Sequence, residues 1–291
     1  TIEGLQKAGF EAYIVGGAVR DLLLKRVPKD FDVATNATPD QVQKLFRKAR
    51  LIGRRFQIVH VTFFGKGQPE IIEVSTFRAL LENAGEHVAE NGRILRDNVW
   101  GSQHEDAARR DFSINAMYYD PETQIVVDYH NGLKDSKSRT LRMIGDAATR
   151  YREDPVRIIR AVRFAAKLSP LGFKLEPKTA GPLVKSQKLL HDVPQSRLFD
   201  EMLKLLQTGH AIATIEQLRK LGMAKGIYPL LDVAVERADT PFVKAALVDT
   251  DRRVNEGKPV APSFLLACVL WEDVRKGWQD RLDRREHPFP A

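Results

Sequence analysis

The chain has 291 residues, of which 43% are hydrophobic and 29% charged, and its formal net charge at pH 7 is +8. This composition can bury a core, which excludes an intrinsically disordered or low-complexity chain. The single cysteine, Cys268, excludes an internal disulfide framework and a cysteine-based zinc cage. The basic balance favours a polyanionic partner, a nucleic acid or a nucleotide, but charge alone is a weak signal.

The sequence does not suggest contact with a membrane. Its longest apolar run, Phe264–Trp271, is far shorter than the ~20 residues of a membrane helix. No basic and apolar signal peptide opens the chain, so we expect a cytoplasmic protein. Because the chain starts at Thr1 and stops after a charged stretch, we also expect that it is truncated.

Strand-like and helix-like segments alternate over the first ~120 residues, and helical periodicity dominates from about residue 147. We therefore predict a small α/β head followed by an all-helical body. Thr38, Pro39 and Gln41 predict a capped helix start, because they supply an N-cap, a proline in the first turn and a capping box. In chain order we expect strands at 12–15, 31–34, 57–64, 70–77 and 126–129, and helices at 18–24, from 39 onward and at 105–115.

Two glycines stand between the first strand and the first helix of this series. Gly16 and Gly17 would let the backbone approach a phosphate group, which free N–H groups at a helix start favour. Arg20 would add a guanidinium group that fits a phosphate. Most glycine pairs are ordinary turns, so the pair alone does not define a site.

Three acidic residues lie in or beside predicted strands. Asp30 and Asp32 are two residues apart, so on a strand they share one face roughly 6–7 Å apart. Two such carboxylates repel unless a cation lies between them, and they suit Mg²⁺ with substrate phosphates and water. Glu73, inside an apolar strand, would be a third carboxylate. The alternative is that Asp30 starts a turn and that Asp32 and Glu73 face water at strand edges.

A basic helix carries arginine at every third position, at Arg157, Arg160 and Arg163. Close arginines repel one another, which favours an anionic partner over the alternative of a solvated helix face. Asp154 precedes Pro155 and fits either an N-cap or a ligand contact. The residues that we expect to face the core of this helix are Val156, Ile159, Val162 and Ala166.

Together these segments resemble the class II nucleotidyltransferases of the DNA polymerase beta superfamily, which include bacterial poly(A) polymerases and CCA-adding tRNA enzymes. The resemblance rests on Gly16–Asp21 followed by Asp30–Asp32, on Arg109–Phe112, and on Glu153–Phe164. It spans about residues 9 to 207. Leu51–Val61 is similar to the segment typical of the poly(A) polymerases. Lys25 departs from the glycine common at this position, which bears on the shape of the loop.

The resemblance implies an α+β fold with a mixed-sheet nucleotidyltransferase head at 1–140, a helical neck at 141–227 and a helical body at 228–291. It also implies catalytic roles for Asp30, Asp32, Asp111 and Glu73, with Mg²⁺ as cofactor held by Asp30 and Asp32. Asp111 has the alternative of holding the ribose. The residues that it assigns to the nucleotide are Gly16, Gly17, Arg20, Arg110, Asp154, Arg157, Arg160 and Arg163.

The activity implied is template-independent transfer of AMP from ATP to RNA 3′ ends. A basic cluster that includes Lys44, Lys48, Arg54 and Arg55 would lead the RNA to the site, or would be a solvated surface. A CCA-adding or A-adding tRNA nucleotidyltransferase is the nearest alternative, and a non-catalytic RNA-binding protein on the same fold is another. By analogy, an RNA helicase or a degradation complex is a possible partner.

Overall fold

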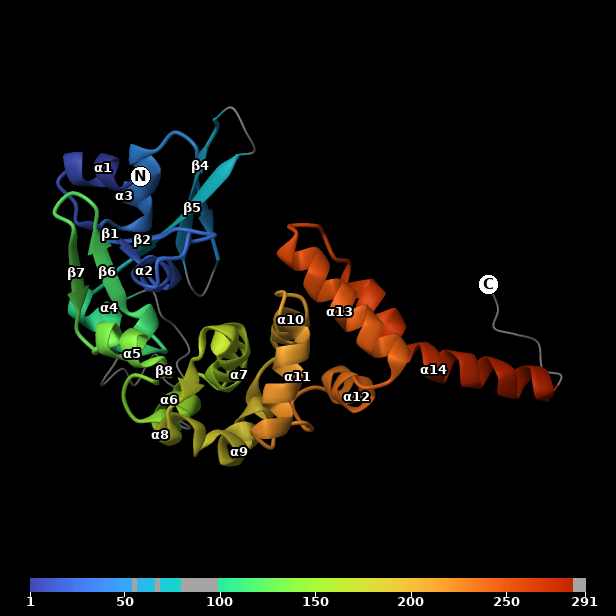
Figure 1. Cartoon of the computed structure of the whole chain (residues 1–291). Coiled ribbons are helices and arrows are strands. Elements are labelled where there is room, and N and C mark those ends of the chain that lie inside the picture. The colour runs from blue at the N-terminus through green and yellow to red at the C-terminus, as the bar shows by residue number, and fades with distance from the viewer. Residues whose placement is uncertain (54–56, 66–68, 80–98, 285–291) are drawn as a thin grey trace. The chain divides into compact units, whose positions relative to one another are not determined.

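A computed structural model describes residues 1–53, 57–65, 69–79 and 99–284 of the chain (Figure 1). It divides into two compact units. The first comprises Thr1–Asp154 and Leu171–Pro182, and the second comprises Pro155–Pro170 and Leu183–Ala291. The division into head, neck and body at residues 140 and 227 stays a prediction.

The first unit is built on a mixed sheet, as the sequence predicts. Among the described residues its strands follow the order β3-β4-β5-β2-β1-β6-β7. β2 and β5 run parallel, and the other neighbouring strands run antiparallel. The strands are β1 (Ala12–Val15), β2 (Asp32–Thr35), β3 (Ala49–Ile52), β4 (Ile58–Phe63), β5 (Glu70–Thr76), β6 (Met117–Asp120) and β7 (Ile125–Asp128).

One face of the sheet is covered by two helices. Val33, Val59 and Val74 are buried on this face and pack with Leu5 and Val42 in one hydrophobic cluster. Leu5 belongs to α1 (Ile2–Lys7) and Val42 to α3 (Pro39–Leu45). Because side chains alternate along a strand, the residues between these valines point to the other face.

The predicted start of α3 is confirmed in detail. The Thr38 hydroxyl accepts a hydrogen bond from the Gln41 backbone N–H, the Gln41 side chain accepts one from Thr38, and Pro39 is the first helical residue. The helix expected at 105–115 is wrong in its second half. α4 (Gln103–Arg109) ends because Arg110 is extended, with ψ of 162°, and Phe112 then forms a bridge to Met143.

Four further helices and a two-stranded sheet complete the described part of the first unit. Their bounds are α2 (Gly17–Leu23), α5 (Gly132–Ser138), α6 (Ala147–Glu153), β8 (Thr140–Leu141), β9 (Lys174–Leu175) and α8 (Pro177–Ala180), with a 3-10 turn at Ser113–Asn115.

The second unit is helical, as predicted. Its α-helices are α7 (Val156–Leu168), α9 (Leu183–Ser186), α10 (Gln195–Leu206), α11 (Ala211–Lys220), α12 (Pro229–Arg237), α13 (Pro241–Asn255) and α14 (Pro262–Asp283). The four residues expected to face the core of α7 are all buried. Within the described ranges, no helix has both the length and the apolar character that a membrane span requires.

Lys25, which follows α2, has a φ of 57°. This left-handed conformation strains a residue with a Cβ atom but not glycine. We expect Lys25→Gly to raise the free energy of unfolding by about 0.5 kcal/mol, because relief of the strain outweighs the added flexibility of the unfolded chain. Urea unfolding measures this change. Lys25→Ala is the matched control, and an equal gain there would contradict strain as the cause.

Candidate active site

The predicted glycine turn lies beside two other predicted site residues. β1 ends at Val15, Gly16 has φ 78° and ψ −135°, and α2 begins at Gly17. A Cβ atom placed on Gly16 would lie 3.9 Å from Nη1 of Arg110 and 4.0 Å from Oδ2 of Asp32. The turn therefore brings bare backbone next to a carboxylate and a guanidinium group.

Gly16 provides a direct test of this turn. Its backbone angles are open to glycine but strained for other residues, so we expect Gly16→Ala to lower the free energy of unfolding by about 1–3 kcal/mol. Urea unfolding measures the loss. Gly65→Ala is the matched control, since a Cβ atom there would meet no neighbouring atom. A Gly16→Ala variant as stable as the control would show that the turn is not strained.

The carboxylates of Asp32 and Glu73 lie side by side on the face of the sheet opposite to α1 and α3. The two residues are direct partners in the parallel pairing of β2 and β5, and both are exposed. Asp30 precedes the strand rather than lying on it, because β2 begins at Asp32. Reduced hydration of the crowded Asp32 carboxylate, followed by the charges of Glu73 and Asp30, raises its pKa to about 6, while Arg110 opposes the rise.

β5 is an interior strand, so Glu73 is not an edge residue. On its other side it pairs with His60 of β4, whose Nε2 lies 3.3 Å from Oε1 of Glu73. The residue pattern around His60 predicts a packing or surface residue and not a member of the site. The strand patterns at 57–64 and 70–77 predict two strands paired across the turn between them, and the structure confirms the pairing of β4 with β5. The register that places His60 beside Glu73 does not follow from those patterns.

Arg110 is held by a cluster of polar groups that the sequence analysis also missed. Its Nε and Nη2 donate to Oδ2 of Asp106 at 3.2 and 3.1 Å, and its Nε donates to the Tyr118 hydroxyl at 3.2 Å. Tyr118 donates to the same Asp106 oxygen at 2.6 Å, and Asp106 is buried. Burial would lower the pKa of Arg110, but Tyr118 and Asp106 outweigh it and raise that pKa. The cluster holds a positive charge beside Gly16.

Arg20 is buried, with 2% of its surface exposed. Its Nε and Nη2 donate to Oδ1 of Asp21 at 2.9 and 2.8 Å, and its Nη1 donates to Oδ1 of Asn115 at 3.0 Å. These bonds tie the first turn of α2 to the 3-10 turn before β6. Arg20 thus stabilises the backbone that follows the glycine turn through these hydrogen bonds. Its contact with a triphosphate stays a prediction.

Asp111 is also buried, and its Oδ1 accepts a hydrogen bond from the backbone N–H of Phe112 at 2.9 Å. Arg150 of α6 holds the extended segment that carries Asp111. Nη2 of Arg150 donates to the carbonyl oxygens of Arg109 and Arg110 at 2.7 and 2.8 Å. Arg150 therefore holds the backbone between two predicted site residues.

The remaining predicted nucleotide residues are Asp154, the last residue of the first unit before the chain enters the second, and three arginines of α7 in the second unit. Asp154 follows α6, so α7 begins after it with Pro155 as the N-cap residue. Arg157 is buried. The guanidinium carbons of Arg160 and Arg163 lie 5.6 and 5.5 Å from the centroid of the Phe164 ring. Nη1 of Arg163 also lies 3.7 Å from Oε2 of the buried Glu201.

Two of the four predicted RNA-binding cations, Lys44 and Lys48, lie among the described residues. Lys44 belongs to α3, which covers the valine face of the sheet. Lys48 lies just before β3, and its Nζ is 3.6 Å from the centroid of the Phe64 ring. Arg54 and Arg55 lie outside the described residues.

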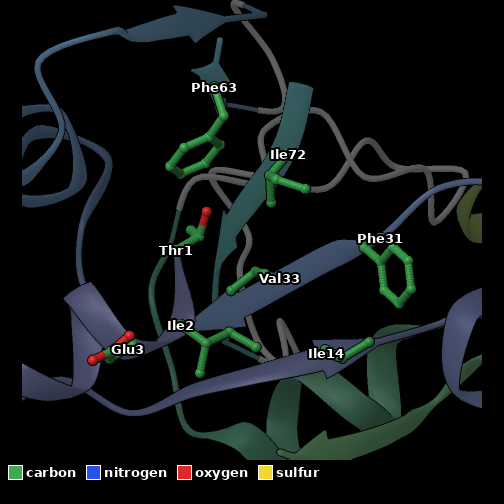
Figure 2. Close-up of a pocket in the computed structure, with 8 residues that line it drawn as sticks. All are labelled: Thr1, Ile2, Glu3, Ile14, Phe31, Val33, Phe63 and Ile72. Atoms are coloured by element: carbon green, nitrogen blue, oxygen red, sulfur yellow. The ribbon is translucent and has the colours of Figure 1, made fainter. Parts of the chain in front are cut away.

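A cavity of about 400 Å³ opens on the valine face, opposite to Asp32. Figure 2 shows Ile2, Val33, Phe63 and Ile72 around it. Thr1 and Glu3 are its polar lining residues, so its hydrocarbon walls do not suit a triphosphate. The cavity is separate from the carboxylate site because Val33 and Asp32 point to opposite faces.

The acidic residues fit a divalent cation as a partial ligand set. The described residues contain no group of three or more His, Cys, Asp or Glu side chains arranged to hold a metal ion. Mg²⁺, however, is commonly bound through one or two carboxylates together with substrate phosphates and water. The raised pKa of Asp32 marks a place where negative charge is in excess, which such a cation would relieve.

A mixed sheet that carries adjacent carboxylates beside a glycine turn defines a nucleotidyltransferase head, and the comparisons agree. The family described as "Poly A polymerase head domain" matches residues 12–142. The family described as "Probable RNA and SrmB- binding site of polymerase A" matches residues 172–235. The chain belongs to the family of bacterial poly(A) polymerases and CCA-adding enzymes.

Three relatives illustrate the likeness. Poly(A) polymerase I of Escherichia coli O6:H1 is 49% identical over 276 residues, which cover 92% of this chain and 58% of the relative. The CCA-adding enzyme of Bacillus licheniformis is 36% identical over 233 residues, covering 80% of this chain and 55% of the relative. The crystal structure of the Bacillus stearothermophilus CCA-adding enzyme with CTP has a TM-score of 0.65 at 27% identity, covering 93% and 80%. The chain thus spans somewhat more than half the length of the Escherichia coli and Bacillus licheniformis relatives.

Proposed function

We propose that this chain adds AMP from ATP to RNA 3′ ends without a template. The observation that carries the proposal is the pairing of Asp32 with Glu73 beside the Gly16 turn and Arg110. The higher identity to a protein named poly(A) polymerase I than to CCA-adding enzymes supports AMP transfer over CCA synthesis.

Asp30 and Asp32 would hold Mg²⁺ in this proposal. When bound, the metal would neutralise phosphate charge and favour ionisation of the RNA 3′-hydroxyl. Glu73, on the strand next to Asp32, would orient that hydroxyl and attract its proton. The 3′-oxygen would form a bond to the α-phosphorus of ATP as the bond to pyrophosphate breaks, and no covalent enzyme intermediate is needed.

The other predicted residues have binding roles. Gly16 and Gly17 would let the triphosphate approach the backbone, and Arg110 would add positive charge next to it. Asp111 would hold the ribose or act with the catalytic acids.

In this proposal, Asp154 and the arginines of α7 select the base and hold the nucleotide. Asp154 and Arg157 would read the edge of the adenine, because planar guanidinium donors commonly recognise base edges. Arg160 and Arg163 would lie nearer the sugar and phosphates. An RNA helicase or degradation-complex partner stays a prediction.

The test supplies ATP or CTP separately to the chain, with an unstructured RNA and with a tRNA that lacks its CCA end. We expect long adenylate tails on the unstructured RNA, dependent on Mg²⁺, and no CTP incorporation. Incorporation of CTP at the tRNA end would instead establish a CCA-adding activity. RNA binding without incorporation of either nucleotide would contradict the proposed transfer reaction.

A further inference from the structure

The face of the sheet that carries Asp32 and Glu73 continues across β4 to β3. Register pairs run from Asp32 to Glu73, from Glu73 to His60 and from His60 to Arg50. Direct partners in paired strands point to the same face, and neighbouring strands are about 4.8 Å apart. Arg50 therefore lies roughly 14 Å from Asp32 along a line of residues that share one face.

A cationic and aromatic patch lies at the outer end of this line. Lys48 and Arg50 are both exposed, and they lie two positions apart at the start of edge strand β3. Phe64, just after β4, is 62% exposed, and the Lys48 Nζ lies 3.6 Å from the centroid of its ring. Ile71 of β5, which pairs with Thr62 of β4, adds a further exposed apolar side chain.

This face contrasts with the other side of the same strands. Val59, Val61 and Val74 are nearly inaccessible to solvent under α1 and α3. On the patch side, Arg50 and Glu73 are exposed and His60 is partly exposed, with isoleucines at the ends of the strands. The exposed Phe64 ring beside Lys48, with Arg50 on the same face, has no role in the core of the fold. Exposed aromatic rings together with cations are the combination that binds single-stranded nucleic acids.

We propose that Lys48, Arg50 and Phe64 form a track that binds the single-stranded RNA substrate upstream of its 3′ end. The two cations contact phosphates, and Phe64 stacks on a base. Glu73 and Asp32 lie at the other end of the track, where the 3′-hydroxyl would react. This inference rests on the proposed function for the direction of the RNA, and it assigns the head itself a part in holding the substrate.

RNA binding is the direct test, measured by fluorescence anisotropy with a labelled 12-nucleotide oligoadenylate that ends in a 3′-deoxy group, without Mg²⁺ or ATP. The double variant Lys48→Ala/Arg50→Ala is expected to bind about tenfold more weakly, with the slope of log K against log salt reduced by about 1.4. Phe64→Ala is expected to weaken binding about fivefold or more while leaving that slope unchanged.

Lys7→Ala is the matched control, because it removes one exposed lysine from α1, on the helix-covered side of the sheet. It is expected to change binding less than twofold. The single variant Lys48→Ala is the matching one-charge comparison, and equal weakening by Lys7→Ala and by Lys48→Ala would overturn the track and indicate diffuse charge attraction. Binding of a polyglutamate peptide as tight as that of RNA would also overturn it, in favour of an acidic protein partner.

Extension assays separate this inference from the proposed function. If the wild-type chain extends RNA and the Lys48→Ala/Arg50→Ala variant has an unchanged KM for RNA, the track is wrong and the proposed function survives. If the binding contrast holds but the wild-type chain transfers no AMP, the track survives as an RNA site and the proposed function fails. We expect the KM for RNA to rise about tenfold in the double variant and the KM for ATP to stay unchanged.

Discussion

Asp32→Asn is expected to lower RNA extension at least ~1,000-fold, because the amide would weaken both the metal site and the electrostatic stabilisation of phosphoryl transfer. The same change is expected to stabilise the metal-free protein. The wild-type carboxylate lies beside Glu73 and Asp30, and its pKa of about 6 shows that the folded state disfavours its charge. Loss of activity and gain of stability in one variant would distinguish a functional carboxylate from a structural one.

The pH dependence of this effect has a defined sign. The folded-state pKa of Asp32, about 6, lies above the ordinary value of an aspartate side chain, so between about pH 4 and 6 the folded protein holds a proton that the unfolded chain has released. Wild-type stability therefore falls relative to Asp32→Asn as pH rises through this window. Above pH 6 the difference should reach about 1 kcal/mol after allowance for solvent screening at this exposed group.

Thermal unfolding in EDTA at pH 4 and at pH 7.5 measures the change. We expect the Tm of Asp32→Asn to exceed that of wild type by roughly 2–4 °C at pH 7.5 and to match it at pH 4. Added Mg²⁺ should raise the Tm of wild type more than that of the variant. Asp280→Asn, an exposed position on α14, is the control and should change neither quantity. A variant that is less stable than wild type at pH 7.5 would contradict the repulsion between carboxylates.

Much of this arrangement follows from local sequence patterns. The Gly16 turn, the capped start of α3 and the buried face of α7 depend on neighbours a few residues apart, so spacing and residue type were sufficient to predict them. The resemblance to known nucleotidyltransferases added the roles of Asp30 and Asp32, which an isolated pair of aspartates cannot define.

What the sequence could not provide depends on distant pairings. The parallel register of β2 and β5 brings Asp32 and Glu73 together across 41 positions, and no local pattern specifies that register. The extended backbone at Arg110 was missed because the helical pattern continues through it, whereas the bridge from Phe112 to Met143 overrides local preference. The cluster around Asp106 includes Arg110, two residues before this bridge, and no local sequence pattern identifies the cluster.

Asp106→Ala is expected to lower the free energy of unfolding by about 3 kcal/mol, because it removes the acceptor of several hydrogen bonds from one buried position. Its two oxygens accept bonds from Arg110, from the Tyr118 hydroxyl and, at 3.1 Å, from the Arg78 backbone N–H. Without Asp106, the partly buried Arg110 charge loses its acidic partner and the Tyr118 hydroxyl loses its acceptor. Urea unfolding followed by circular dichroism measures the loss.

Two further variants separate the charge from the hydroxyl. Tyr118→Phe keeps the ion pair and is expected to lose only about 1 kcal/mol. Asp106→Ala/Arg110→Met removes both charges, so it is expected to recover about half of the stability that Asp106→Ala loses. RNA extension should stay low in the double variant, because Arg110 would contact the triphosphate. A double variant as unstable as Asp106→Ala would show that Asp106 acts through the backbone of Arg78 and not through the charge of Arg110.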